Sequence, residues 1–238
     1  MTSDFPVVFA LYPQVTQLDF TGPYEVFRRL PGARCRLASI AGGTIRGGGN
    51  IAFAETERLD AVTDCALLCV PGGLGTVAAL GDGGYLEQLR RLARPARYIT
   101  SVCTGSLLLA AAGLLERRRA ACHWAWRESL EALGAIADAG RVVRDGNIIT
   151  GGGVTAGIDM ALTVIAEIAG VDVAESVQLE IEYAPSPPFD SGLPERARPQ
   201  IVAAVTRRLD PLRSQRAAAI ERAAAGLAAT RAAKATRQ

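Results

Sequence analysis

The sequence of 238 residues has a single histidine and no long apolar run, and each shortage excludes a class of protein. The lone His123 and the scattered cysteines do not supply a zinc ligand set, so we expect no metal. The longest apolar stretches, at residues 66–71 and 107–115, fall well short of the roughly 18–20 residues that span a bilayer. The N-terminus also lacks the basic segment and the small-residue cleavage site of a signal peptide. We therefore expect a cytoplasmic protein with no membrane partner.

The chain has little net charge overall, but its C-terminal segment is strongly basic. From residue 196 onward there are 10 basic and 2 acidic residues, a balance of +8, so residues 1–195 carry −6 of the overall +2. A basic tail can indicate nucleic-acid binding, but here the body is acidic and the tail has no interleaved aromatic residues. We expect no nucleic-acid partner and interpret the tail as a solvated or packing helix.

What the sequence does contain is an alternation of short apolar runs with helical patterns. This alternation predicts an α/β fold, a three-layer sandwich of the flavodoxin-like type with a mostly parallel central sheet and helices on both faces. Strands are predicted at residues 6–11, 34–40, 66–70 and 97–102, with a hairpin formed by residues 141–144 and 147–150 around Asp145-Gly146. Helices are predicted at residues 20–30, 85–93, 105–115, 155–169 and 173–183.

The chain shows no linker that separates two cores. We expect residues 1–198 to form one catalytic α/β domain, with the proline-rich segment 185–188 as an extended loop near its end. Residues 199–238 are predicted to form an amphipathic helix to about Leu227, packed on the same domain and followed by a frayed basic tail. Its apolar positions are Ile201, Val205, Leu209 and Leu212.

Five cysteines without an export signal indicate a reducing compartment, where Cys35, Cys65 and Cys69 are predicted to pack as small hydrophobes. Cys103 differs because a strand enters it, Cys-Thr-Gly-Ser turns, and a helix of small residues leaves. That pattern predicts a nucleophile elbow, in which a strained turn holds the side chain at the carboxyl edge of the sheet. The alternative is a buried cysteine at a strand end. No base follows the cysteine, because residue 104 is threonine.

Two further segments follow strands and predict companions for this thiol. Asp19 lies after the first strand, where it is either a helix N-cap or a carboxylate that faces Cys103 across the sheet edge. Gly72 and Gly73 follow the strand at residues 66–70, and their backbone N–H groups could form an oxyanion site.

The remaining candidates are weaker on sequence grounds. Gly152 lies in a glycine run after the hairpin, which is either tight packing or a pocket wall. His123 precedes a tryptophan and a helical pattern, a context in which a structural role is more common than chemistry.

With these residues in view, the sequence resembles the isocyanide hydratases of the PfpI-like superfamily, whose fold is related to the class I glutamine amidotransferases. The resemblance covers residues 5–228 and depends on LDFTGP (18–23), VPGG (70–73), TSVCTGS (100–106), AAGLL (111–115), TGGGVTAGID (150–159) and LEIEYAPSPPFD (179–190).

Two departures from the wider superfamily support this assignment. Peptidase-like members have histidine directly after the nucleophile, where this chain has Thr104, and many relatives have glutamate where this chain has Asp19. The resemblance further implies that a small aliphatic residue, Val154, packs near the site. It also implies a homodimer with the active site close to the subunit interface.

The resemblance implies hydration of an isocyanide to an N-substituted formamide, with no metal or organic cofactor. Cys103 would attack the terminal carbon to give a thioimidate, Asp19 would act as general acid and base, and Thr104 would position water. The resting ionisation of Cys103 stays open, because a helix N-terminus lowers a thiol pKa and an ionised neighbour raises it. Two other readings remain: a cofactor-free glyoxalase-like lyase acting on small dicarbonyls, and a non-catalytic cysteine redox sensor.

Overall fold

The computed structural model describes residues 4–235, with side chains through residue 229. Ten strands are assigned over this range: β1 Phe5–Leu11, β2 Ala33–Ser39, β3 Gly43–Arg46, β4 Ala52–Arg58, β5 Leu67–Val70, β6 Tyr98–Val102, β7 Arg119–Ala121, β8 Ile136–Asp138, β9 Val142–Asp145 and β10 Ile148–Gly151. Eight α-helices are assigned over the same range: α1 Gln17–Phe27, α2 Thr76–Leu80, α3 Gly83–Ala93, α4 Gly105–Ala111, α5 Ser129–Ala132, α6 Ala156–Ala169, α7 Val171–Glu180 and α8 Pro199–Ala235.

Eight of the strands form one sheet in the order β3-β4-β2-β1-β5-β6-β10-β9. All neighbours in this sheet pair in parallel except the two edge strands, β3 and β9. Every residue of β1 is buried, as expected of an apolar strand covered on both faces. Strands β7 and β8 form a separate parallel pair.

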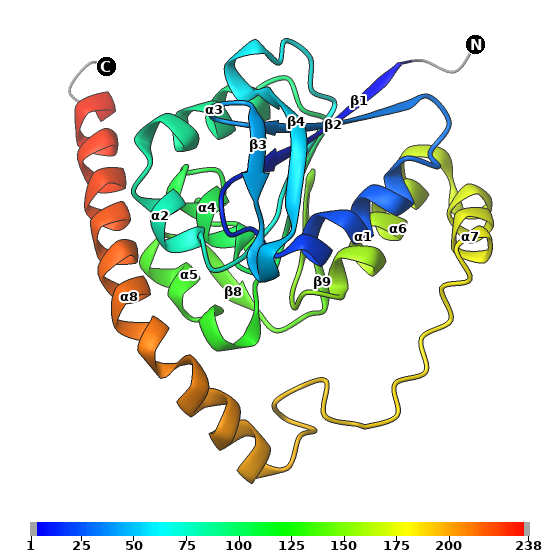
Figure 1. The fold of residues 1–238 in the computed structure, drawn as a ribbon. Helices are drawn as coiled ribbons and strands as arrows, with labels where there is room; N and C mark the ends of the chain where they lie inside the picture. Colours follow the sequence, from blue (N-terminus) through cyan, green and yellow to red (C-terminus); the bar gives the residue numbers. More distant parts are fainter. Residues whose placement is uncertain (1–3, 236–238) are drawn as a thin grey trace.

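The helices cover both faces of the large sheet, and Figure 1 shows α1, α6 and α7 on one side with α2 to α5 and α8 on the other. Two clusters of buried apolar side chains fill the two interfaces between the layers. The chain crosses from α7 on one side to α8 on the other through a long segment without regular structure (Figure 1). The predicted three-layer α/β fold is confirmed.

The structure adds elements that the sequence pattern did not predict, namely β3, β4, β7, β8, α2 and α5. Helix α8 also continues to Ala235, beyond the predicted end near Leu227, and passes through Pro211 without a break. The end of the predicted frayed tail, residues 236–238, lies outside the described residues. No helix within residues 4–235 is long and apolar enough to cross a membrane.

Candidate active site

Strands β1, β5, β6 and β10 run parallel and end at one edge of the sheet, and the loops that follow them meet there. Open parallel sheets bind their ligands at this edge, because the loop backbone and helix N-termini converge on it. The loop after β6 begins with Cys103, the loop after β5 contains Gly72 and Gly73, and Asp19 lies in the first turn of the helix after β1.

Cys103 occupies a strained turn. Its φ of 59° is in the left-handed region, which costs a side-chain-bearing residue on the order of 1–3 kcal/mol. The Cys103 amide donates a hydrogen bond of 3.0 Å to the Gly151 carbonyl, which ties the turn to the end of β10. The side chain is 6% exposed. This geometry is that of the predicted nucleophile elbow.

Asp19 is fully buried and is not the N-cap of α1, because Thr16 holds that position. Its Oδ2 accepts a hydrogen bond of 2.9 Å from the Gly72 amide. Its other oxygen, Oδ1, accepts no hydrogen bond from any described nitrogen or oxygen, and the Cys103 thiol interacts with the carboxyl group. The structure therefore brings the carboxyl group of Asp19 and the thiol of Cys103 together.

Burial dominates the electrostatics of this pair. It raises the pKa of Asp19 to about 7, while the Gly72 amide and the Cys103 thiol lower that pKa by smaller amounts. Burial also raises the pKa of the Cys103 thiol well above its ordinary value, and Asp19 raises it further. The Thr104 amide at the start of α4 lowers the thiol pKa by less than burial raises it. The resting pair is a neutral thiol beside a carboxyl group that changes charge near neutral pH.

Thr104 joins the turn after β6 to the loop after β5. Its Oγ1 accepts a hydrogen bond of 3.0 Å from the Gly73 amide and lies 2.8 Å from the hydroxyl oxygen of Thr76. The Thr76 hydroxyl donates to the Gly73 carbonyl at 2.8 Å and lies 3.1 Å from the Tyr12 hydroxyl oxygen, which donates to the Pro71 carbonyl. A buried chain of hydroxyl groups thus fixes the position of Thr104.

Glycine is required where these loops cross. A Cβ atom on Gly72 would lie 2.5 Å from the Thr104 backbone nitrogen and 2.9 Å from Oδ2 of Asp19. Contacts this short do not occur, so a side chain at this position would push the carboxyl group away from the loop. Gly72 and Gly73 both donate their N–H groups to site side chains, Asp19 and Thr104, rather than to an open cavity.

A cavity of about 150 Å³ opens beside the thiol, and we call it the thiol cavity. Its volume is below the range of about 300–1,000 Å³ that is typical of sites for drug-sized ligands, which suits a small substrate. It is lined by Thr16, Gly73, Leu74, Cys103, Thr104, His123, Trp126, Val154, Leu209, Leu212 and Arg216.

Among the residues predicted from the sequence, Val154 lines this cavity and Gly152 does not. The Gly152 amide donates to the Arg141 carbonyl at 2.9 Å. His123 lines the cavity, and its Nδ1 accepts a hydrogen bond of 3.3 Å from the Ala125 amide. Burial and the nearby Arg216 lower the pKa of His123, which keeps the ring neutral.

The sequence interpretation missed the contribution of α8. Leu209, Leu212 and Arg216 of this helix form part of the cavity wall, and the Arg216 guanidinium stacks 4.0 Å from the ring centroid of Trp126. These three positions follow the i, i+3, i+7 spacing of one helix face. That spacing could have placed Arg216 on the apolar side of the helix despite its charge.

Within residues 4–235, no group of three or more histidine, cysteine, aspartate or glutamate side chains is placed to hold a metal ion. The thiol cavity and the groups around it offer acid–base and nucleophilic chemistry instead.

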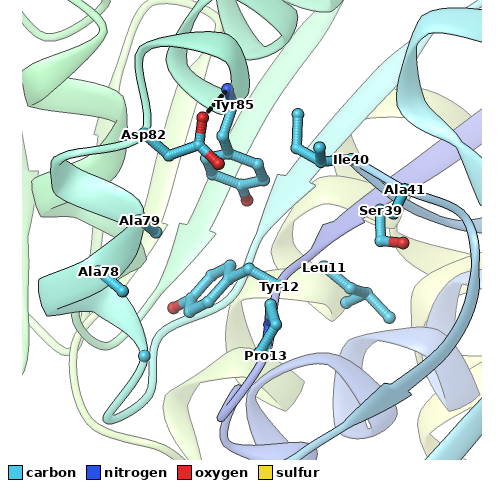
Figure 2. A pocket seen from close by; sticks show the side chains of 11 residues that line it. Leu11, Tyr12, Pro13, Ser39, Ile40, Ala41, Ala78, Ala79, Asp82 and Tyr85 are labelled. Carbon is cyan, nitrogen blue, oxygen red and sulfur yellow. Dashed lines mark hydrogen bonds between the residues drawn. The ribbon is translucent and has the colours of Figure 1, made fainter.

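A second cavity, of about 330 Å³, lies at the ends of β1 and β2, and we call it the tyrosine cavity. Figure 2 shows the rings of Tyr12 and Tyr85 on its wall and the Asp82 carboxylate accepting a hydrogen bond from the Tyr85 amide, at 2.9 Å. No cysteine lines it. Its lining residues are Leu11, Tyr12, Pro13, Ser39, Ile40, Ala41, Gly75, Ala78, Ala79, Asp82 and Tyr85.

Comparison with known proteins agrees with this geometry. The model of the DJ-1/PfpI family matches residues 6–167, which include both Asp19 and Cys103. The chain belongs to the DJ-1/PfpI family. The resemblance inferred from the sequence motifs is confirmed.

Two relatives of the chain differ in how much of their own length the match covers. The chain is 47% identical over 219 residues to the isonitrile hydratase of Pseudomonas putida, covering 92% of this chain and 96% of that protein. It is 31% identical over 186 residues to the HTH-type transcriptional regulator CdhR of Pseudomonas aeruginosa, covering 74% of this chain and 54% of the regulator.

A solved structure extends the comparison to the fold. A ThiJ/PfpI family protein from Pseudomonas syringae superposes with a TM-score of 0.88 at 36% sequence identity, covering 94% of this chain and 91% of that one. This coverage includes most of the chain beyond the family match, which ends at residue 167.

Proposed function

We propose that this DJ-1/PfpI protein is an isonitrile hydratase, which adds water to an isocyanide and releases an N-substituted formamide. One observation carries the proposal: the Cys103 thiol and the buried Asp19 carboxyl group lie together beside a small cavity. The supporting comparison is the 47% identity to an isonitrile hydratase over 92% of the chain.

The substrate explains why both groups are needed. The terminal carbon of an isocyanide, R–N≡C, must gain a nucleophile and a proton. A thiol supplies the nucleophile, and a carboxyl group with a pKa of about 7 can both take and return a proton at neutral pH. An aspartate with an ordinary pKa would be too weak a base for a thiol.

In the first half of the reaction, the Asp19 carboxylate takes the thiol proton of Cys103 as the sulfur attacks the terminal carbon. Protonated Asp19 then delivers that proton to the same carbon, which gives the thioimidate R–N=CH–S–Cys103. Because the thiol pKa is raised by burial, the charged sulfur forms only as the carbon–sulfur bond forms.

In the second half, the Asp19 carboxylate takes a proton from water, and the resulting hydroxide adds to the thioimidate carbon. Protonated Asp19 gives its proton to the nitrogen, the carbon–sulfur bond breaks, and the proton of the added hydroxyl group passes to the sulfur. The products are R–NH–CHO and the neutral thiol, and Asp19 is again a carboxylate. Thr104, which hydrogen-bonds Gly73 and Thr76, orients the water in this proposal, and Val154 and the α8 leucines contact the R group.

Two parts of the proposal concern the protein as a whole. We propose a cytoplasmic homodimer with the thiol cavity near the subunit interface. Residues 1–198 would form the catalytic domain, and α8 packs against the same domain through α2, α4 and α5.

The alternatives are less well supported. A redox sensor needs a thiolate that oxidises readily, whereas burial raises the pKa of Cys103. A glyoxalase-like lyase acts on small dicarbonyls, and assay of a dicarbonyl beside an isocyanide distinguishes the two reactions.

The test is formamide production from cyclohexyl isocyanide by wild type and Asp19→Asn. We expect turnover by the wild type and a loss of about 10²–10⁴-fold in the variant, the usual range for a general acid–base group. Because Asp19 must be a carboxylate at the start, wild-type kcat/KM should rise with pH through about 7 and level off above it. Absence of turnover by folded wild type, or full activity in the variant, contradicts the proposal.

A further inference from the structure

Arg216 is a buried cation in the wall of the thiol cavity. Its side chain comes from α8, it is 3% exposed, and it lines the cavity together with Cys103 and Thr104. A charged side chain is almost never buried without a partner that offsets the loss of solvation.

The contacts of Arg216 leave part of its hydrogen-bonding capacity unused. One Nη atom lies 3.4 Å from the Gly73 carbonyl oxygen, and the guanidinium stacks on Trp126. The Nε atom is buried and donates to no described group. A guanidinium has five N–H donors in a rigid fork whose geometry matches a carboxylate. Arg216 therefore has unused donors from which a carboxylate could accept hydrogen bonds.

No carboxylate of the described residues fills this gap. The residues that line the thiol cavity include no aspartate or glutamate, and Arg216 forms no ion pair with any described side chain. Asp19, the acidic group of the site, is held instead by the Gly72 amide. The other cation near Trp126, Arg213, stacks at 5.8 Å and pairs with Asp210 outside the cavity.

We propose that the thiol cavity binds isocyanides that carry a carboxylate near the isocyano group, and that Arg216 pairs with this carboxylate. The inference rests on the proposed function, because it names the class of isocyanide that the same site receives. The small volume of the cavity favours a short isocyano acid, in which the carboxylate and the reacting carbon lie only a few bonds apart. Pairing would satisfy Arg216 and orient the isocyano carbon toward the sulfur of Cys103.

Arg216 could instead act on the enzyme alone, by stabilising negative charge on the Cys103 sulfur. The two roles make different predictions. A residue that stabilises the sulfur assists every isocyanide equally, whereas a residue that pairs with the substrate assists only substrates with a carboxylate. The comparison of a charged substrate with its neutral ester therefore separates them.

The experiment measures kcat/KM for isocyanoacetate and for methyl isocyanoacetate at pH 7.5, with wild type, Arg216→Met and Arg213→Met. Arg213 is the matched control because it lies on the same helix and beside the same tryptophan, but outside the cavity wall. We expect the wild type to prefer the carboxylate by about 10-fold or more, since hydrogen bonds to charged groups are the stronger ones. Arg216→Met should lose this preference, because its kcat/KM falls more for the acid than for the ester, and Arg213→Met should keep it.

Arg216→Lys guards against a folding defect, because it keeps the charge and should retain part of the preference. A readout without turnover is the melting temperature of Cys103→Ala with N-formylglycine, the expected product, or with its methyl ester. N-formylglycine should raise the melting temperature of Cys103→Ala, whereas its methyl ester should not. In the double variant Cys103→Ala, Arg216→Met, N-formylglycine should no longer raise it.

The outcomes separate the two proposals. Wild type that converts the ester as well as the acid, or an Arg216→Met variant that loses both activities equally, overturns the role of Arg216 and leaves the hydratase intact. Wild type that converts no isocyanide overturns the hydratase, and the binding of N-formylglycine then decides the role of Arg216 by itself.

Discussion

The thiol cavity and the tyrosine cavity lie at the same edge of one sheet, yet they differ in volume, in backbone strain and in the charged groups buried beside them. The tyrosine cavity is the larger, at about 330 Å³ against 150 Å³. The thiol cavity has the strained backbone, the buried carboxyl group beside it and the buried cation. Size alone therefore does not favour a cavity as the reaction site, whereas strain and buried charge together favour the thiol cavity in our proposal.

The two cavities are joined through one side chain. The ring of Tyr12 lines the tyrosine cavity, and its hydroxyl reaches Pro71 and Thr76, the partner of Thr104 in the thiol cavity. Substitutions in each cavity and at this junction test whether the division of roles is real.

The largest effect is expected for Cys103→Ala, which removes the thiol. Isocyanide turnover should fall by about 10⁴-fold or more, because no second cysteine lines the cavity. Cys103→Ser should be almost as inactive, since a serine hydroxyl gives up its proton far less readily than a thiol and is the weaker nucleophile. Cys35→Ala, at a half-buried cysteine in β2, is the control and should keep wild-type activity. Substantial turnover by Cys103→Ala would remove the distinction between the cavities.

Asp19→Asn should gain stability while it loses activity. Folding raises the pKa of Asp19 from its ordinary value of 3.8 to about 7, so the folded state binds this proton more tightly than the unfolded state does. The stabilisation from protonated Asp19 is present below about pH 4 and is lost as pH rises through about 7.

Asparagine stays neutral and avoids that loss, so Asp19→Asn should be more stable than wild type at pH 8, by about 2–4 kcal/mol. The difference should shrink toward zero near pH 4. Urea unfolding at the two pH values measures it. Equal free energies of unfolding for the two proteins at pH 8 would mean that burying the Asp19 carboxylate does not destabilise the folded state.

Tyr12→Phe should have an intermediate effect, because it removes the two hydrogen bonds that join the cavities. Loss of a buried hydroxyl costs about 1–3 kcal/mol when its partners stay unsatisfied. We expect reduced stability of this size in denaturant unfolding. We also expect a fall in kcat of less than about tenfold, since Thr104 keeps its bond to the Gly73 amide. A loss as large as that of Asp19→Asn would instead place Tyr12 in the chemistry.

The smallest effect is expected for Ala78→Leu, which fills part of the tyrosine cavity from its exposed rim. The kcat/KM for cyclohexyl isocyanide should stay within about twofold of wild type, because Ala78 does not line the thiol cavity. Its counterpart is Val154→Leu in the thiol cavity, which should change the preference among R groups. Equal responses to the two substitutions would contradict the comparison.

The order of strands and helices was largely readable from the sequence because each buried strand is a short, continuous apolar run. Strand β1 matches the predicted residues 6–11 to within one residue, and β6 matches the predicted 97–102 equally well. Strands β7 and β8 were missed because three residues are too short for any periodicity. The antiparallel pair of β3 and β4 was missed because glycines and charged residues dilute its alternation.

The loops of the candidate site could be predicted from the sequence, whereas most of the side chains that line its cavity could not. Cys103, Asp19 and Gly72 come after strands, and parallel strands bring the loops at their carboxyl ends to one edge of the sheet. Arg216 is far away in sequence and has the character of the surrounding basic tail, so only the packing of α8 decides its burial. Similarly, the raised pKa of Asp19 depends on complete burial, which no local pattern reports.

The position of α8 in the sequence has a consequence for biosynthesis. A ribosome makes the turn at Cys103 long before it makes Leu209, Leu212 and Arg216, which complete the wall around it. At about 5–20 residues per second the interval is roughly 5–23 seconds. Throughout it, the sides of α2, α4 and α5 that α8 covers are open to water. A nascent chain that has not reached Pro199 therefore contains Cys103 but lacks the α8 residues that complete the wall of the cavity. The cavity forms only once α8 has been synthesised.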